Sequence, residues 1–272
     1  MRELIVSLFP IYYERYIEVF GGAGWVLFHK PPGNDFEVYN DYNSLLTNLY
    51  RCVREQPKQL IESLRFVLNS REDFDIIRSA LVRDSPMSDI LKASYFYQII
   101  RYSYASGLKS FGSQPHDMWT NFPLIEQAHR RLAKVVIENK DFEKLIRQYD
   151  RPVSFFYLDP PYYETEGYYY NVGEGGFKLE DHIRLRDTLM SIEGKFLLSY
   201  NDHPFIREIY NAPGIQIMEV SRLNNIKQRY DHGCLFEELI IANYDLHERE
   251  QQKPTQMTLF DYKGVEIYHD WT

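Results

Sequence analysis

An α/β fold built on a mostly parallel sheet is predicted by the order of apolar runs along the 272-residue chain. The runs at 16–20, 36–39 and 155–158 are short and rich in aromatic or β-branched residues, which is typical of buried strands. Helical patterns separate them, and glycines or an acidic residue follow each run closely. Open α/β sheets bind ligands at the carboxyl ends of their strands, so the pattern also predicts a site at one edge of the sheet.

Composition indicates a folded protein, because hydrophobic residues make up 44% and aromatic residues 16% of the chain. The length allows either one large α/β domain or a domain with a sizeable insert. Cys52 and Cys234 have no metal-ligand spacing, which favours a reducing compartment and no resident metal. The apolar run at 4–9 is interrupted by Pro10 and Glu14, is too short for a membrane span and lacks a cleavage pattern. We therefore expect a cytoplasmic protein without a membrane partner.

The first strand, at 16–20, is preceded by a helical segment and leads into a glycine-rich turn. Phe20 is followed by Gly21, Gly22 and Gly24, and an apolar stretch that should open a helix begins at Trp25. Glycines at this place let the backbone pass close to a ligand. A plain tight turn is the alternative.

The second strand, at 36–39, ends at Asn40 and Asp41. An acidic residue here lies about 20 residues beyond the glycine turn, the separation at which it reaches ribose hydroxyls in doubly wound folds. Asp41 or Asn43 can instead cap the helix that follows. The two roles are compatible.

A long helical pattern interrupts the strand alternation from about residue 44 to 134, and we interpret 55–133 as an inserted helical subdomain. Its loop at 101–121 combines Arg101, Lys109 and Ser110 with aromatic residues and glycines. Such a loop suits contact with phosphates and unstacked bases, although an ordinary surface loop has a similar composition. A local cluster of this kind matters because the net charge of −8 by itself disfavours a polyanionic partner.

The second half of the chain returns to alternating strands and helices. A strand at 134–137 leads to Asp141 and Phe142, and a helix over 142–149 leads to the strand at 155–158. Further along we expect helices at 179–191 and 205–210, strands at 195–200, 215–220 and 235–244, and a polar, basic loop at 222–232 that contains Arg222.

Asp159-Pro160-Pro161-Tyr162 follows the strand at 155–158 and carries the most specific chemistry. The two prolines stiffen the turn and lack backbone donors, so carbonyl oxygens near them remain available as acceptors. A carboxylate, a carbonyl and a ring are the groups that hold a planar base by its exocyclic amine. A surface turn with an incidental acid is the alternative.

These segments together resemble the Dam-like DNA adenine methyltransferases. The glycine loop is similar to their S-adenosylmethionine loop, Asp41 to the ribose-binding acid, Asp141-Phe142 to the contact with the cofactor adenine, and Asp159 to Tyr162 to the catalytic motif. Two departures are the lack of a Gly-Gly-Lys or Gly-Ser-Lys element before Leu4 and the presence of Val19 where a proline is common.

The resemblance implies a Rossmann-like methyltransferase sheet at 1–54 and 134–247, a target-recognition insert at 55–133 and a tail at 248–272. It implies metal-free transfer of a methyl group from S-adenosylmethionine to N6 of a flipped adenine in double-stranded DNA, in a bacterial or phage-encoded enzyme. Methylation of RNA adenine or cytosine N4, or a noncatalytic DNA-binding remnant, are the alternatives. The implied roles are catalysis for Asp159, Pro160 and Tyr162, and cofactor binding for Phe20, Gly22, Gly24, Asp41, Asp141 and Phe142; the loop patterns add DNA contacts for Arg101, Lys109, Ser110 and Arg222.

The tail contains an apolar island in a polar surrounding. Gln256, Leu259 and Phe260 are similar to the short Gln-x-x-Leu-Phe peptides that dock bacterial proteins on the replication sliding clamp. The alternative is that the island packs back on the domain with Val265 and Ile267.

Overall fold

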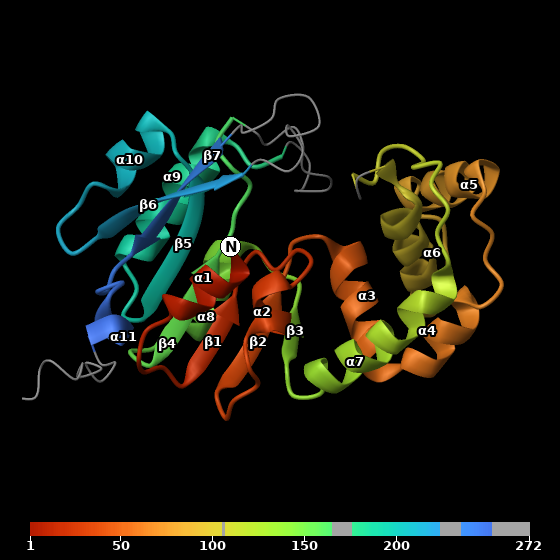
Figure 1. The fold of residues 1–272 in the computed structure, drawn as a ribbon, viewed down its shortest axis with the longest axis horizontal. Coiled ribbons are helices and arrows are strands. Elements are labelled where there is room, and N and C mark those ends of the chain that lie inside the picture. Colours follow the sequence, from red (N-terminus) through yellow and green to blue (C-terminus); the bar gives the residue numbers. More distant parts are fainter. Residues whose placement is uncertain (105–106, 165–175, 224–234, 252–272) are drawn as a thin grey trace, which may run out of the picture.

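The fold is a seven-stranded sheet with helices on both faces and a separate helical lobe on one side (Figure 1). The computed structural model describes residues 1–104, 107–164, 176–223 and 235–251. The strand order is β3-β2-β1-β4-β5-β7-β6, and β7 alone runs in the direction opposite to the other strands. The strands are β1 (Arg15–Glu18), β2 (Phe36–Asn40), β3 (Val136–Glu138), β4 (Ser154–Leu158), β5 (Lys195–Asn201), β6 (Gln216–Leu223) and β7 (Leu235–Ala242).

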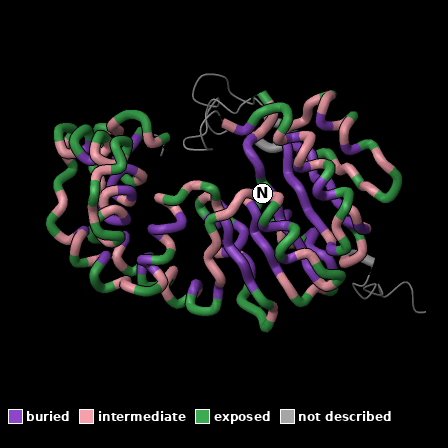
Figure 2. The backbone as a smooth tube through the Cα atoms, turned by 180° about the vertical axis from the view of Figure 1, so that it is seen from behind, coloured by how far each residue is buried: buried purple, intermediate pink, exposed green. Residues whose placement is uncertain are grey.

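The strand order reverses between β1 and β4, whose carboxyl ends therefore adjoin the main crevice of the sheet. Glu18 pairs with Tyr157 in the parallel register of these strands. The glycine loop after β1 and Asp159 after β4 are thus neighbours by topology, as the sequence predicts. β1 and β4 are buried over most or all of their length, which Figure 2 shows as continuous purple.

Two hydrophobic cores lie on opposite faces of the sheet. One face is covered by α8 (Phe142–Tyr149), α9 (Leu179–Met190) and α10 (Pro204–Tyr210). These helices pack on the side chains of β1, β4 and β5 that lie on this face. The other side is covered by α1 (Arg2–Ser7) and α2 (Trp25–His29), and its core continues into the helical lobe. A short α11 (Glu248–Gln251) follows the sheet.

The helical lobe is one bundle connected to the sheet edge at β2 and β3 (Figure 1). α3 packs against α6 and α7 and also contacts β3, so it belongs to the bundle and joins it to the sheet. Ser70 and Ser88 cap α5 and α6, because their side chains accept backbone N–H groups in the first turn of each helix. The helices are α3 (Ser44–Glu55), α4 (Pro57–Leu64), α5 (Arg71–Val82), α6 (Asp89–Tyr102), a 3₁₀ turn (Met118–Asn121) and α7 (Phe122–Leu132).

The predicted α/β class and the sequence of elements are confirmed, and boundaries differ by a few residues. One expectation was wrong: Arg222 lies within β6, which extends to Leu223, and not in a loop. Antiparallel pairing with β7 continues to the end of that strand and explains the difference. Within the described ranges no helix is both long and apolar enough to cross a membrane. Gln256, Leu259 and Phe260 lie outside the described residues.

Candidate active site

A cleft of about 710 Å³ opens at the carboxyl ends of β1 and β4. It combines the glycine loop, the residues after β4, and side chains from β5, β7 and α1. Of the residues assigned to a site from sequence, it contains Phe20, Gly22, Asp159 and Tyr162. Its other lining residues are Met1, Arg2, Ile5, Glu18, Gly21, Ala23, Trp25, Val26, Tyr157, Ser199 and Glu238.

The glycine loop is held in place by the end of β2. The Gly22 backbone N–H donates to Asp41 Oδ2 at 2.8 Å, and the Tyr39 hydroxyl donates to the Gly22 carbonyl at 2.6 Å. Gly22 and Gly24 have φ angles of 50° and 66°, a region that side chains disfavour, so this turn requires glycine. At Gly21 a Cβ atom would lie 2.1 Å from the Tyr39 ring. The loop is therefore a rigid wall of the cleft.

Asp41 holds the loop, and Asn43 caps the next helix. Asp41 Oδ1 accepts the Asn43 backbone N–H at 2.8 Å, while the Asn43 side chain accepts from Leu45 and Leu46 at the start of α3. Burial raises the pKa of Asp41, although its two backbone hydrogen bonds favour the ionised form. Each carboxylate oxygen has accepted one of these backbone donors and can accept about one more, the capacity that a ribose diol needs.

Asp159 is exposed at the end of β4, and Pro160 and Pro161 behind it are buried. The Ser199 hydroxyl from β5 lies 2.9 Å from Asp159 Oδ1 and donates to it. The Tyr157 hydroxyl is also near Ser199, and burial, followed by the charge of Asp159, raises the pKa of Tyr157. The carboxylate is thus fixed by the neighbouring strand.

Tyr162 is half-buried and packs against the ring of Tyr200 with centroids 6.2 Å apart. Tyr200 is fully buried, and its hydroxyl is 2.6 Å from His182 Nδ1 on α9. The Asn201 side chain donates to the Tyr163 carbonyl at 3.1 Å. These contacts hold the chain after Asp159 on a layer of rings and leave part of Tyr162 facing the cleft.

Asp141 and Phe142 lie beside the cleft rather than in its lining. Phe142 is 5% exposed and packs against Phe20, with centroids 5.7 Å apart, and against Phe177 at the same separation. Asp141 caps α8 by accepting the Glu143 N–H at 3.1 Å. Phe20 lines the cleft and contacts Phe142, so it connects the two regions.

Two buried acids in the cleft were not identified from the sequence. Glu18 is the last residue of β1. Burial raises its pKa to about 8, although the hydrogen bond from Tyr16 acts in the opposite direction. Glu238, on β7, is 1% exposed. Glu18 directly precedes Val19 and the glycine loop, and Glu238 interrupts an apolar run. Both positions could therefore have been identified from the sequence as candidate site residues. Together with Asp159 they give the cleft three carboxyl groups.

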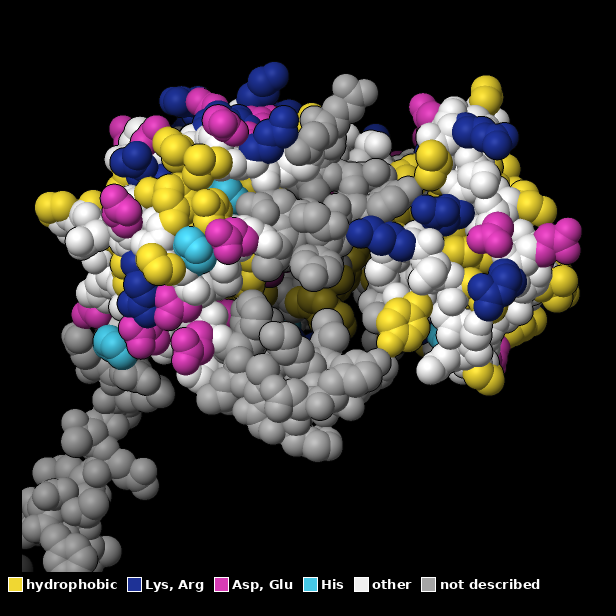
Figure 3. Space-filling model, turned by 90° about the horizontal axis from the view of Figure 1, so that it is seen from above, with side chains coloured by type: hydrophobic (Ala, Val, Ile, Leu, Met, Phe, Trp, Pro, Cys, Tyr) yellow, Lys and Arg dark blue, Asp and Glu magenta, His cyan; other side chains and the backbone are white. Residues whose placement is uncertain are grey.

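The predicted DNA contacts lie outside this cleft. Arg101 is exposed at the end of α6, and its Nε is 3.3 Å from His116 Nε2. Lys109 and Ser110 are exposed in the following loop. Arg222 is on β6, and its side chain is outside the described part of the chain. Figure 3 shows that some Lys and Arg side chains of the helical lobe lie on the side of that lobe nearest the sheet.

The cleft brings the fixed Asp159 carboxylate together with the aromatic face of Tyr162 and the glycine loop. Comparisons with known proteins agree with this chemistry. The model of the D12 class N6 adenine-specific DNA methyltransferases matches residues 2–226. A Type II methyltransferase, M1.LlaDCHI of Lactococcus lactis subsp. cremoris, is 30% identical over 263 residues, which cover 88% of this chain and 90% of that protein. The chain therefore belongs to the D12 class N6 adenine-specific DNA methyltransferases.

Proposed function

We propose that this adenine-specific DNA methyltransferase takes its methyl group from S-adenosylmethionine and acts on a target adenine flipped out of double-stranded DNA. The observation that carries the proposal is the meeting of the glycine loop and Asp159 in one cleft. A donor held by the loop and an amine held by the carboxylate would lie side by side there. Direct transfer needs this proximity, because both reacting atoms must be held within contact distance.

The cleft suits S-adenosylmethionine in shape and charge. The rigid turn at Gly22 and Gly24 allows close backbone approach, and Asp41 has acceptor capacity for the ribose. The carboxylate of Asp159 favours the sulfonium group of S-adenosylmethionine, a charge that S-adenosylhomocysteine lacks. Asp141 and Phe142, linked to the cleft by Phe20, are assigned to the cofactor adenine. When bound, the cofactor supplies an electrophilic methyl group.

Asp159 and the Pro160 carbonyl are the two acceptors for the two hydrogens of the adenine amine. Binding both hydrogens orients the nitrogen lone pair toward the methyl donor, and Tyr162 stacks on the flipped base. Positive charge develops on this nitrogen as the new N–C bond forms and the bond between the methyl group and the donor sulfur breaks, which leaves S-adenosylhomocysteine. The Asp159 carboxylate stabilises that charge, and the nitrogen proton leaves late in the reaction. Ser199 supports this by fixing the carboxylate.

The flipped base requires contacts to the surrounding DNA, and we assign these to Arg101, Lys109, Ser110 and Arg222. The proposed target-recognition part is the insert 55–133, which forms the helical lobe apart from α3. Docking on a sliding clamp through Gln256, Leu259 and Phe260 gains no support from the family match, which ends at residue 226.

Two variants can test the proposed roles of Asp159 in binding the target amine and of Asp41 in binding the cofactor. Asp159→Ala is expected to lose at least about a thousandfold in the single-turnover methylation rate, the scale seen when a preorganised electrostatic group is removed. It should bind S-adenosylhomocysteine like wild type, measured by calorimetry. Asp41→Ala should instead weaken that binding about tenfold, because hydrogen bonds to a charged acceptor are lost. Near-normal turnover in Asp159→Ala would remove it from the mechanism.

A further inference from the structure

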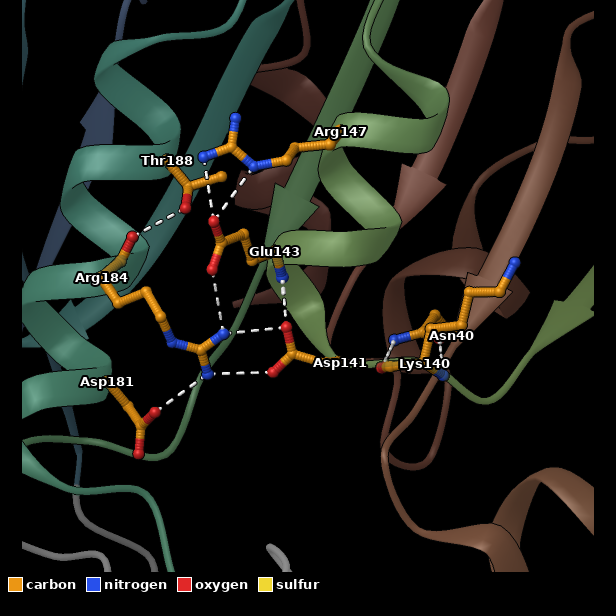
Figure 4. Close-up of polar contacts among 8 residues, drawn as sticks. All are labelled: Asn40, Lys140, Asp141, Glu143, Arg147, Asp181, Arg184 and Thr188. Atoms are coloured by element: carbon orange, nitrogen blue, oxygen red, sulfur yellow. Dashed lines mark hydrogen bonds and ion pairs between the residues drawn. The ribbon is translucent and has the colours of Figure 1, made fainter.

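Arg184, on α9, makes the densest set of polar contacts near the proposed cofactor site, although no sequence pattern pointed to it (Figure 4). Its Nη1 and Nη2 atoms lie 2.8 and 2.9 Å from Asp141 Oδ1 and Oδ2, a two-pronged ion pair. It also contacts Glu143 at 3.2 Å and Asp181 at 2.9 Å. The guanidinium carbon stands 4.0 Å from the centroid of the Phe142 ring.

This arrangement fixes the orientation of the Asp141 carboxylate. Oδ1 accepts the Glu143 backbone N–H and Arg184 Nη1, Oδ2 accepts Arg184 Nη2, and the Lys144 backbone N–H also donates to this carboxylate. Donors from α8 and α9 therefore fix the plane of the group that the proposed function assigns to the cofactor adenine.

Arg184 also keeps Asp141 ionised. Burial by itself raises the pKa of Asp141, but the hydrogen bonds and the charge of Arg184 outweigh it and lower that pKa. Of the neighbouring acids, Glu143 depends on Arg184 least, because it retains Arg147, whose Nη2 lies 2.9 Å away. Asp181 retains the Lys178 backbone N–H at 3.0 Å. Removing Arg184 therefore leaves Asp141 and Asp181 with backbone donors alone within the described contacts.

We propose that Arg184 is a positioning residue for the cofactor: it orients the Asp141 carboxylate toward the 6-amino group of the cofactor adenine. The inference rests on the proposed function, in which Asp141 faces that adenine. Arg184 acts through Asp141 and, by covering one face of Phe142, through the ring that joins Asp141 to Phe20.

The test is a thermodynamic cycle between Arg184 and the amine. Calorimetry would measure the Kd of S-adenosylhomocysteine, and of its analogue lacking the 6-amino group, for wild type and Arg184→Ala. We expect the variant to bind S-adenosylhomocysteine about tenfold more weakly, in line with the loss of one hydrogen bond to a charged group. Affinity for the analogue should change less than about twofold, because that ligand makes no such bond.

Arg147→Ala is the matched control, because it removes an arginine that pairs with Glu143 but does not touch Asp141. Both ligands should bind it as they bind wild type. Arg184→Lys, which keeps a cation but cannot bond both oxygens, should repeat the amine-dependent loss and serves if Arg184→Ala does not fold. Equal losses for both ligands in the Arg184 variants would overturn the positioning role. If wild type bound neither ligand, the proposed cofactor itself would fail.

Discussion

Glu18 shows how one side chain can couple the cleft to pH. It ends β1, is 2% exposed, and accepts a hydrogen bond from the Tyr16 hydroxyl at 2.6 Å. Burial raises its pKa from 4.5 to about 8, so the folded protein keeps this carboxyl protonated at neutral pH. At neutral pH the cleft then presents fewer negative charges than its three acids suggest.

The shifted pKa predicts a definite pH dependence of stability. Between 4.5 and about 8 the folded state holds the proton and the unfolded chain releases it. The contribution of Glu18 to the free energy of unfolding therefore falls as pH rises, by at most about 1.4 kcal/mol per pH unit. It levels off above the pKa of the folded state. Glu18→Gln should flatten this part of the curve in urea titrations at a series of pH values.

Glu126→Gln, at an exposed position on α7, is the control and should keep the wild-type slope. A Glu18→Gln curve that runs parallel to the wild-type curve from pH 5 to 8 would show that Glu18 titrates as an ordinary carboxyl group.

Site residues could be predicted where the chemistry is local in sequence. Asp159 stands beside its prolines and Tyr162, and Gly22 beside its strand, so each was found from neighbours along the chain. Ser199 reaches the cleft because β5 pairs parallel with β4, and Glu238 reaches it because β7 pairs antiparallel with β5, which places Glu238 beside Asn201. That register depends on contacts between residues far apart in sequence, and no spacing rule gives it.

At the scale of elements, α7 is tied to the sheet by Arg131. Its Nη atoms lie 2.6 and 2.7 Å from the two oxygens of Glu37 on β2, and Nη2 also donates to the Leu27 carbonyl at 2.9 Å. Glu37 is buried and also contacts Lys30 Nζ at 2.9 Å. One guanidinium therefore joins the end of the helical lobe to β2 and α2.

Arg131→Ala is expected to lower the free energy of unfolding by about 3 kcal/mol, because it leaves a buried carboxylate with one cation instead of two. Urea denaturation would measure this. Arg130→Ala, at the exposed neighbouring position, should change stability by less than about 0.5 kcal/mol. A loss below about 1 kcal/mol in Arg131→Ala would mean that Lys30 alone satisfies Glu37.

The elements themselves were largely predictable, because buried strands and amphipathic helices carry their own periodicity. The helical pattern from residue 44 onward was recognised, and α3 is the helix with which it begins. Its packing against α6 and α7 was not predictable, since an apolar stripe shows that a helix face is buried but not what buries it. The tie at Arg131 was missed for the same reason.

For the whole molecule, the net charge of −8 opposes binding to DNA, so local charge must provide the attraction. The helical lobe exposes Arg101 and Lys109 at and beyond the end of α6. Figure 3 shows basic side chains on the side of this lobe nearest the sheet, which is where we propose that DNA binds. Each phosphate contact releases counterions and steepens the salt dependence of binding.

If Lys109 contacts a phosphate, Lys109→Ala should weaken binding to unmethylated duplex DNA and reduce the slope of log K against log salt concentration by roughly one. Fluorescence anisotropy at several salt concentrations measures this slope. Lys144→Ala removes the same charge from an exposed position on α8, a helix packed against the sheet and outside the helical lobe, and should leave the slope unchanged. Lys109→Ala and Lys144→Ala have the same formal net charge. A difference between their slopes therefore depends on the position of the lost charge. Equal slopes in wild type and Lys109→Ala would place the phosphate path elsewhere on the protein.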